Sequence, residues 1–328
     1  MVRDAGRPGP RRPVVIDCDP GHDDALAILL AARHFDVLGI TTVAGNVDVE
    51  RTTLNALRLV DLAGLEVPVA RGCAAPLVRA PVHAAAIHGE SGLDGYAFPP
   101  VRGEPDPRHA VEFLVETARA RDDLTIIAVG PLTNVAVALR TAPDIAPRLA
   151  AISVMGGSAT AGNITPAAEF NTWFDPEAAD IVFRSGVPLW MSGLNLTRQV
   201  NVDRDALARI EAIRTHAAEV AASLLREYLA RQLAHGGNAA GPLHDPCAVA
   251  ILLVPSVISW TAMHVAVELR GEHTRGMTVC DARHLPEVNP AAAPGIGPRG
   301  AAPNARVGLR ADRAAFFRLL EDALAALP

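Results

Sequence analysis

Short runs of β-branched and aliphatic residues alternate along this chain with longer, Ala- and Leu-rich amphipathic stretches. The short apolar runs predict strands, and the stretches with apolar residues at helical spacing predict helices. The predicted strands are residues 14–16, 37–43, 124–129, 152–155, 187–191, 277–280 and 305–309. The predicted helices are residues 25–30, 110–120, 176–184, 203–234, a helix after Pro246 and a C-terminal helix. This alternation predicts an α/β fold with a single-domain, open and mostly parallel sheet that carries helices on both faces.

Four aspartates lie within eight residues at the first predicted strand-to-helix junction, in the segment DCDPGHDD: Asp17, Asp19, Asp23 and Asp24. One aspartate can cap the helix that follows, but a cap explains only one of the four. Neighbouring carboxylates without partners are costly, so the cluster predicts a bound cation. Oxygen ligands without a set of His or Cys residues favour calcium or magnesium over zinc.

Other polar and glycine residues follow the predicted strands, where ligands bind in an open α/β sheet. They are Asn46, Gly130, Asn134, Gly156, Gly157 and Asn195. In the segment AEFN, Glu169 and Asn171 would point the same way if the backbone were extended, which suits adjacent hydroxyls of a sugar. Further along, His244 and Asp245 precede Pro246 at the start of an apolar helix, where by themselves they are typical of a helix cap.

The composition argues against several classes of partner and catalytic residue. The net charge of -6 gives no concentrated basic face, so neither a nucleic-acid nor a membrane partner is expected. All 30 basic residues are arginine, which excludes a Schiff-base lysine and a P-loop lysine. The four cysteines form no C-x-x-C pair, so free thiols are expected.

The ends of the chain and one internal segment stand apart from this pattern. Residues 1–12 are basic and Pro-rich and predict a flexible extension before a domain that spans residues 13–328. Residues 286–303 are rich in Pro, Ala and Gly and predict a long loop. No apolar stretch reaches the roughly 18 residues of a membrane span, and no secretory apolar region follows the N-terminus, so a cytoplasmic protein is expected.

The segment DCDPGHDD resembles the D-x-D-P-G-x-D-D signature of the inosine-uridine preferring nucleoside hydrolase family. The similarity continues, in the order found in that family, through TTVAGN, IHGESG, VGPLTN, MGG, AEFN, DPEAA and HDPCAVA. The resemblance implies a calcium-dependent enzyme that hydrolyses the N-glycosidic bond of ribonucleosides to a free base and ribose. It also implies a homodimer or homotetramer.

The resemblance further implies a metal site and a catalytic base. Asp19, Asp24, Asp245 and the backbone carbonyl of Val129 would bind Ca²⁺. Asp19 would also take a proton from the attacking water, with Asp17 behind it. Negative charge around the ribose suits the oxocarbenium-like transition state of this hydrolysis.

The same resemblance assigns the substrate contacts. The 2′ and 3′ hydroxyls would be held by Asp23, Asn171 and Asp245, and the 5′ hydroxyl by Asn163 and Glu169. The remaining ribose pocket would be lined by Asn46 and Met155.

The resemblance assigns fewer residues to the part of the site that would bind the nucleobase. His244 would give the departing base a proton. Tyr228 and Gln232 lie one helical turn apart, and this pair mixes the pattern of non-specific members with that of pyrimidine-preferring members. His88 either contacts the nucleoside or lies on a loop surface.

Two other functions fit part of the pattern. A D-x-D after a first strand also occurs in phosphohydrolases with an aspartate nucleophile, which would be Asp17, and magnesium. The absence of lysine and the additional Asp23–Asp24 pair count against that function. A non-catalytic nucleoside- or ribose-binding protein with a retained calcium site is the third hypothesis.

Overall fold

A computed structural model describes residues 11–84, 89–234, 240–253, 256–283, 285 and 301–328. Its centre is an eight-stranded sheet with the strand order β3-β2-β1-β4-β5-β6-β12-β9. The strands are β1 (Pro13–Cys18), β2 (Asp36–Thr42), β3 (Val69–Arg71), β4 (Leu124–Ala128), β5 (Leu149–Met155), β6 (Leu189–Ser192), β9 (Ile258–Met263) and β12 (Ala305–Ala311). All neighbouring pairs are parallel except β12 with β9, so the predicted open and mostly parallel sheet is confirmed.

The strand order reverses between β1 and β4. From β1 the chain builds outward through β2 and β3, and from β4 it builds the other way through β5 and β6. The crevice at the carboxyl ends of two such strands is the usual ligand site of a doubly wound sheet. The aspartates that follow β1 and the residues that follow β4 therefore meet at this point.

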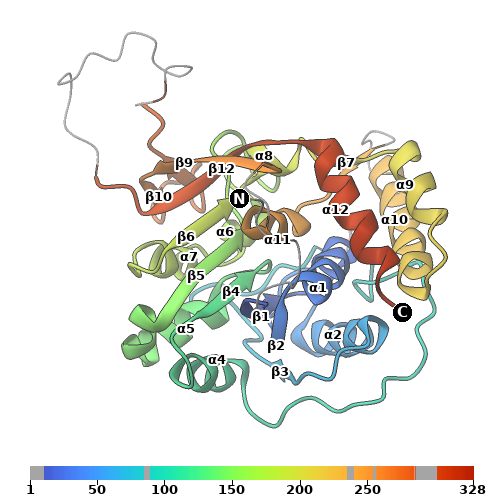
Figure 1. The fold of residues 1–328 in the computed structure, drawn as a ribbon. Helices are drawn as coiled ribbons and strands as arrows, with labels where there is room; N and C mark the ends of the chain where they lie inside the picture. Colours follow the sequence, from blue (N-terminus) through green and yellow to red (C-terminus); the bar gives the residue numbers. More distant parts are fainter. Residues whose placement is uncertain (1–10, 85–88, 235–239, 254–255, 284, 286–300) are drawn as a thin grey trace, which may run out of the picture.

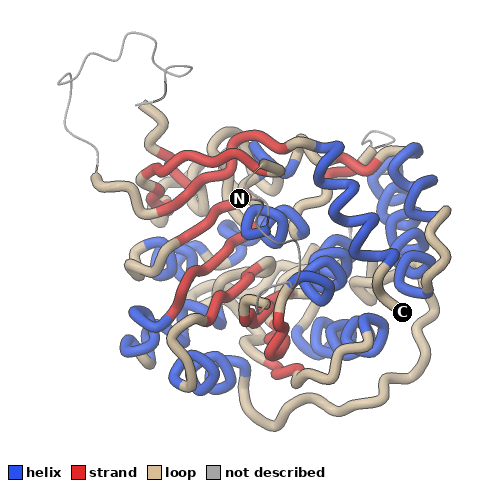
Figure 2. Tube along the Cα trace, in the orientation of Figure 1, coloured by secondary structure: helices blue, strands red, loops and turns tan. Residues whose placement is uncertain are grey.

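Helices cover both faces of the sheet. They are α1 (His22–His34), α2 (Val49–Ala63), α4 (Ala110–Arg119), α5 (Thr133–Thr141), α6 (Phe170–Phe174), α7 (Pro176–Phe183), α8 (Leu194–Thr197), α9 (Arg204–Glu211), α10 (His216–Ala234), α11 (Pro246–Leu253) and α12 (Arg313–Ala325), with a 3-10 turn η1 (Pro143–Arg148). In Figure 1, α4, α5 and α7 lie to the left of the sheet, and α1, α2, α10 and α12 lie to the right. Each side has its own apolar core, so the sheet, drawn red in Figure 2, is buried on both faces. This explains why the central strand β1 is buried throughout.

Two pairs of short strands complete the structure and lie outside the main sheet. They are β7 (Asn201–Val202) with β8 (Gly241–Pro242), and β10 (Val265–Val267) with β11 (Thr278–Cys280), both antiparallel. The predicted strand at 277–280 thus belongs to a small separate sheet.

Two local predictions were wrong. The single helix predicted over 203–234 is two helices, α9 and α10, because the Thr215 hydroxyl accepts a hydrogen bond from the Ala218 amide and starts a new helix. The backbone is extended at Glu169 but helical at Asn171, so the alternation of an extended segment does not apply to this pair; Glu169 is the N-cap of α6 and accepts hydrogen bonds from the Asn171 and Thr172 amides. Asp175 is the N-cap of α7, and its side chain accepts a hydrogen bond from the Ala178 amide.

Most of the predicted 286–303 loop and of the 1–12 extension lies outside the described residues, and β1 begins at Pro13. Among the helices that the structure describes, none is long and apolar enough to cross a membrane.

Candidate active site

A pocket of about 410 Å³ opens at the carboxyl ends of β1 and β4. Its size is typical of small-molecule sites. The predicted residues that line it are Asp19, Asp23, Asn46, Val129, Met155, Asn163, Glu169, Asn171, Tyr228, Gln232, His244 and Asp245. Asp24 is fully buried beneath them, and His88 lies outside the described residues. The fold therefore brings together side chains from positions 19 to 245 of the chain.

Asp19 lies on the floor of this pocket in a close-fitting backbone cradle. Its Oδ2 accepts a hydrogen bond of 2.7 Å from the Asn46 amide, and its backbone carbonyl accepts one of 3.0 Å from Asn46 Nδ2. A Cβ added at Gly45 would overlap Asp19 Oδ2, and a Cβ added at Gly130 would lie 2.6 Å from Oδ1. The carboxylate thus fits only because the two neighbouring loops carry glycine.

We expect Gly45→Ala to lower kcat/KM of the reaction in this pocket by about 100-fold, because the new methyl group must displace the Asp19 carboxylate, and a shift of about 1 Å can cost that much. The matched control is Gly103→Ala, since a Cβ there meets nothing within 4 Å. Steady-state kinetics of both purified variants measures the difference. Equal activities would show that the position of Asp19 is not tightly set.

Asp23, Asp24 and Asp245 form a buried carboxylate cluster whose oxygens lie within 4.8 Å of one another. Asp24 accepts hydrogen bonds from the Gly21 and Asp19 amides, at 2.9 and 3.2 Å. Three carboxylates buried this close together repel one another, and a cation bound between them would relieve that repulsion.

Burial and mutual repulsion shift the acidity of this cluster. Burial, followed by the neighbouring carboxylates, raises the pKa of Asp19 and of Asp245 well above the ordinary value. The same two causes raise the pKa of Asp24 to about 7. None of the ion pairs within the described part of the chain involves these aspartates. Their negative charge is therefore uncompensated by arginine, which is the condition that a metal ion would relieve.

Asp17 lies behind the pocket, fully buried. Its Oδ1 accepts hydrogen bonds from the Thr41 hydroxyl at 2.6 Å and from Asn134 Nδ2 at 2.8 Å, while Oδ2 has no hydrogen-bond partner among the residues that the structure describes. Burial raises its pKa to about 7. Asn134, one of the polar residues at the strand ends, thus supports the aspartate cluster and does not line the pocket.

The donor set fits a hard divalent cation. It consists of carboxylate oxygens from two helix starts, together with the nearby Val129 carbonyl, and contains neither thiolate nor imidazole. The Val129 carbonyl accepts a hydrogen bond of 2.8 Å from Asn171 Nδ2, and its second lone pair is available to another partner.

A wall of polar side chains faces the cluster across the pocket. Glu169 accepts hydrogen bonds from the Gly157, Asn171 and Thr172 amides, at 2.9, 2.9 and 3.2 Å. Burial nevertheless raises its pKa to about 7. Asn171 Nδ2 donates to the Met155 carbonyl at 3.1 Å as well as to Val129. These bonds fix the carboxyl and amide groups in place before any ligand binds.

His244 lies at the other end of the pocket, next to Asp245. Its Nδ1 lies 2.7 Å from the Thr197 hydroxyl, and its backbone amide donates to Asp23 Oδ2 at 3.3 Å. Burial is the main cause that lowers the pKa of His244, the Asp23 charge opposes this, and the Arg198 charge adds to it. The histidine ring is therefore oriented by Thr197, a residue that carried no signal in the sequence.

Tyr228 and Gln232 lie on α10 and line the same pocket as His244. The Tyr228 hydroxyl donates to the Pro242 carbonyl at 2.9 Å, and the Gln232 side chain hydrogen-bonds the same hydroxyl. Tyr228, Gln232 and Pro242 all line the pocket.

Other residues of the pocket were missed at the sequence level. They are Ala84, Ile164, Phe170, Leu194, Arg198 and Pro242. Phe170 lies between the two polar residues of AEFN, so its position in that motif was the one available signal. The predicted strand-end residue Asn195 does not line the pocket, because its amide joins Ala159 to Gly308.

The same architecture occurs in proteins of known activity. A family model described as inosine-uridine preferring nucleoside hydrolase matches residues 14–318. The pyrimidine-specific ribonucleoside hydrolase RihB of Escherichia coli K12 is 41% identical over 315 residues, which cover 95% of this chain and 96% of RihB. The solved plant nucleoside hydrolase PpNRh1 has a TM-score of 0.85 at 30% identity, covering 97% of this chain and 100% of its own. A purine-preferring ribonucleoside hydrolase from Gardnerella vaginalis has a TM-score of 0.85 at 29% identity, with coverages of 96% and 98%.

With these relatives, the doubly wound fold and its acidic pocket define an enzyme of the ribonucleoside hydrolase class, which acts in nucleoside catabolism. The chain belongs to the inosine-uridine preferring nucleoside hydrolase family. The family resemblance seen in the sequence is thereby confirmed.

Proposed function

We propose that this enzyme is a calcium-dependent hydrolase of ribonucleosides, with pyrimidine ribonucleosides as its preferred substrates. The main observation in support is the pocket in which uncompensated buried carboxylates face a fixed polar wall, with His244 at one end. Bound calcium would supply charge compensation and a coordinated water. Asp24, Asp245, Asp19 and the Val129 carbonyl would hold it.

The ribose occupies the end of the pocket between the aspartates and the Glu169 wall. Asp23, Asp245 and Asn171 bind the 2′ and 3′ hydroxyls, and Glu169 with Asn163 binds the 5′ hydroxyl. Asn46 and Met155 complete the ribose site. Negative charge gathered around the sugar stabilises the positive charge that develops on it as the glycosidic bond breaks.

Asp19 acts as the general base. Its carboxylate lies on the pocket floor with a raised pKa, which makes it a stronger base than an exposed aspartate. It removes a proton from the attacking water, and the remaining hydroxide adds to the anomeric carbon.

His244 assists departure of the base. This role requires the Thr197 hydroxyl to donate to Nδ1, so that the proton resides on Nε2. Tyr228 and Gln232 border the space for the nucleobase, and the Gln232 amide can hydrogen-bond it. The pyrimidine preference rests on this pair and on the 41% identity to a pyrimidine-specific relative. His88 remains a candidate for a further contact with the nucleobase.

The two alternative functions have less support. Asp17 does not line the pocket, and one of its oxygens is occupied by Thr41 and Asn134, so it is poorly placed as a phosphoryl nucleophile. A nucleoside-binding protein without turnover would need the same pocket but no catalytic base. The cytoplasmic location, the homodimeric or homotetrameric state and the absence of nucleic-acid and membrane partners remain predictions.

Assay of base release from uridine, cytidine, inosine and adenosine tests the proposal. We expect turnover of the two pyrimidine nucleosides to exceed that of the purine nucleosides. Binding of a nucleoside without release of base from any of the four would instead support the non-catalytic function.

We expect His244→Ala to lower kcat for uridine by about 100-fold or more and kcat for nitrophenyl riboside by less than about threefold, because nitrophenolate departs without a proton. Thr197→Val should give a smaller loss with the same substrate dependence, since it removes the group that orients the imidazole. The measurement is kcat for both substrates with each variant. Equal losses on the two substrates would contradict a role in base departure.

A further inference from the structure

Arg198 lines the pocket but has no role in the function proposed so far. It directly follows Thr197 at the end of α8, and the Thr197 hydroxyl contacts His244 Nδ1. Arg198 is therefore joined in sequence to the residue that orients the histidine. Arg198 and His244 line the same pocket, and the Arg198 charge acts on the His244 imidazole, so the two residues lie on the same side of the pocket.

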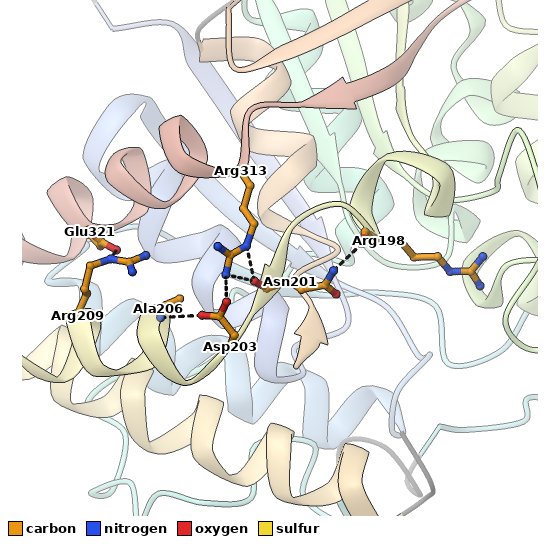
Figure 3. A network of polar contacts seen from close by, with 7 residues as sticks. All are labelled: Arg198, Asn201, Asp203, Ala206, Arg209, Arg313 and Glu321. Carbon is orange, nitrogen blue, oxygen red and sulfur yellow. Dashed lines mark hydrogen bonds and ion pairs between the residues drawn. The ribbon is translucent and has the colours of Figure 1, made fainter. Parts of the chain in front are cut away.

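The backbone of this segment is held firmly from two sides. Figure 3 shows the Asn201 side chain donating to the Arg198 carbonyl, at 2.7 Å, while Arg313 donates to the Asn201 carbonyl and pairs with Asp203 at 2.6 Å. On the other side, β7 pairs with β8, and the Leu243 amide donates to the Val200 carbonyl at 2.9 Å. The segments before and after these short strands, one with Arg198 and one with His244, thus form one supported unit.

The guanidinium group extends away from that network, as Figure 3 shows. Its Nη2 donates to the Gly162 carbonyl at 2.7 Å and its Nη1 to the Ala161 carbonyl at 3.3 Å. These carbonyls directly precede Asn163, which lines the pocket. Arg198 forms no ion pair with any carboxylate in the described part of the chain. It is an exposed cation whose charge no carboxylate neutralises, at the rim of an acidic pocket.

We propose that Arg198 is a catalytic residue at the leaving-group end: its guanidinium donates a hydrogen bond to a carbonyl oxygen of the departing base. A pyrimidine leaves with the electron pair of the glycosidic bond, and the resulting negative charge is shared by its ring nitrogen and carbonyl oxygens. A guanidinium stabilises such an oxygen strongly, because the bond is charge-assisted and the group does not lose its proton.

The step balances without any further reactant. The bond between the anomeric carbon and the base nitrogen breaks, and its electrons leave with the base. Water supplies hydroxide to the anomeric carbon and a proton to Asp19. The base then gains one proton from His244 or from solvent, while Arg198 remains charged throughout.

This inference rests on the proposed nucleoside hydrolysis, and a series of leaving groups tests it. We expect Arg198→Met to lower kcat by about 100-fold for uridine, less for 5-fluorouridine and less than about threefold for nitrophenyl riboside. Arg198→Lys should retain only part of the activity on uridine, because lysine keeps the positive charge but lacks the planar set of donors of the guanidinium group. Arg209→Met is the matched control, since Arg209 pairs with Glu321 away from the pocket, and it should leave all three rates unchanged.

Each other outcome has a definite meaning. Equal losses of kcat on the three substrates would show that Arg198 only holds the loop at Ala161 and Gly162, and would overturn the inference. Unchanged rates in Arg198→Met would also overturn it. If the wild-type enzyme releases base from no nucleoside, the proposed function itself fails, which is a result distinguishable from both.

Discussion

The Asp19→Asn variant is expected to fold normally and to lose about 10³-fold in kcat for every nucleoside substrate. The amide retains an oxygen that can accept the bond from the Asn46 backbone, and it removes a buried charge, so the free energy of unfolding, compared between the two chelated proteins, should not fall. The asparagine amide cannot take a proton from water, and this causes the loss in kcat. Steady-state kinetics with uridine and thermal unfolding of the same preparation measure the two effects.

A charge-matched substitution provides the control for Asp19→Asn. Asp144 is exposed and pairs with Arg119 on the surface, so Asp144→Asn should change neither kcat nor the unfolding temperature appreciably. Retention of more than about one tenth of the wild-type kcat in Asp19→Asn would exclude Asp19 as the general base.

The second large effect is expected on metal removal. Treatment with a chelator should abolish hydrolysis of uridine and lower the unfolding temperature, and added Ca²⁺ should restore both. A ligand at 100 times its dissociation constant stabilises the folded state by about 2.7 kcal/mol. The physical reason is the buried cluster of Asp23, Asp24 and Asp245, to which no cationic side chain among the described residues is paired.

Calorimetric titration of the chelated protein with Ca²⁺, Mg²⁺ and Zn²⁺ would identify the ion. We expect tight binding of Ca²⁺ and weaker binding of the other two, because the donors are oxygens held in an irregular arrangement. Asp24→Asn should weaken Ca²⁺ binding at least tenfold, whereas Asp144→Asn should leave it unchanged. Full activity after exhaustive chelation would contradict a metal-dependent reaction.

Much of the fold could be predicted because its signals are local. The buried run before Asp17 and the apolar helix after Asp24 each show their periodicity in a few residues, and their alternation predicts a parallel sheet. The helix break at Thr215 could not be predicted, because the amphipathic pattern continues across it while the Thr215 hydroxyl contacts both the Ala218 amide and the Leu324 carbonyl. Tertiary contact overrides periodicity at that point.

The candidate site divides in the same way. The acidic residues were found because four aspartates in one short segment are chemically unusual wherever they occur. Arg198 and Thr197 were not found, because an arginine after a short helix is unremarkable until the chain brings it beside His244. Pro242 was likewise not found, because only the fold brings its carbonyl to the Tyr228 hydroxyl, 14 residues away along the chain.

The sequence by itself determined the α/β class, the aspartate cluster with its need for a cation, and the family. These three features depend on residue type and on spacing over a few residues, which can be read without knowing the fold. Only the tertiary structure decided which aspartates lie close enough to share a cation, that Asp17 lies behind the pocket, and that Arg198 and His244 line the same pocket. Those relations depend on strand order and on the pairing of β7 with β8, which join residues that local spacing does not connect.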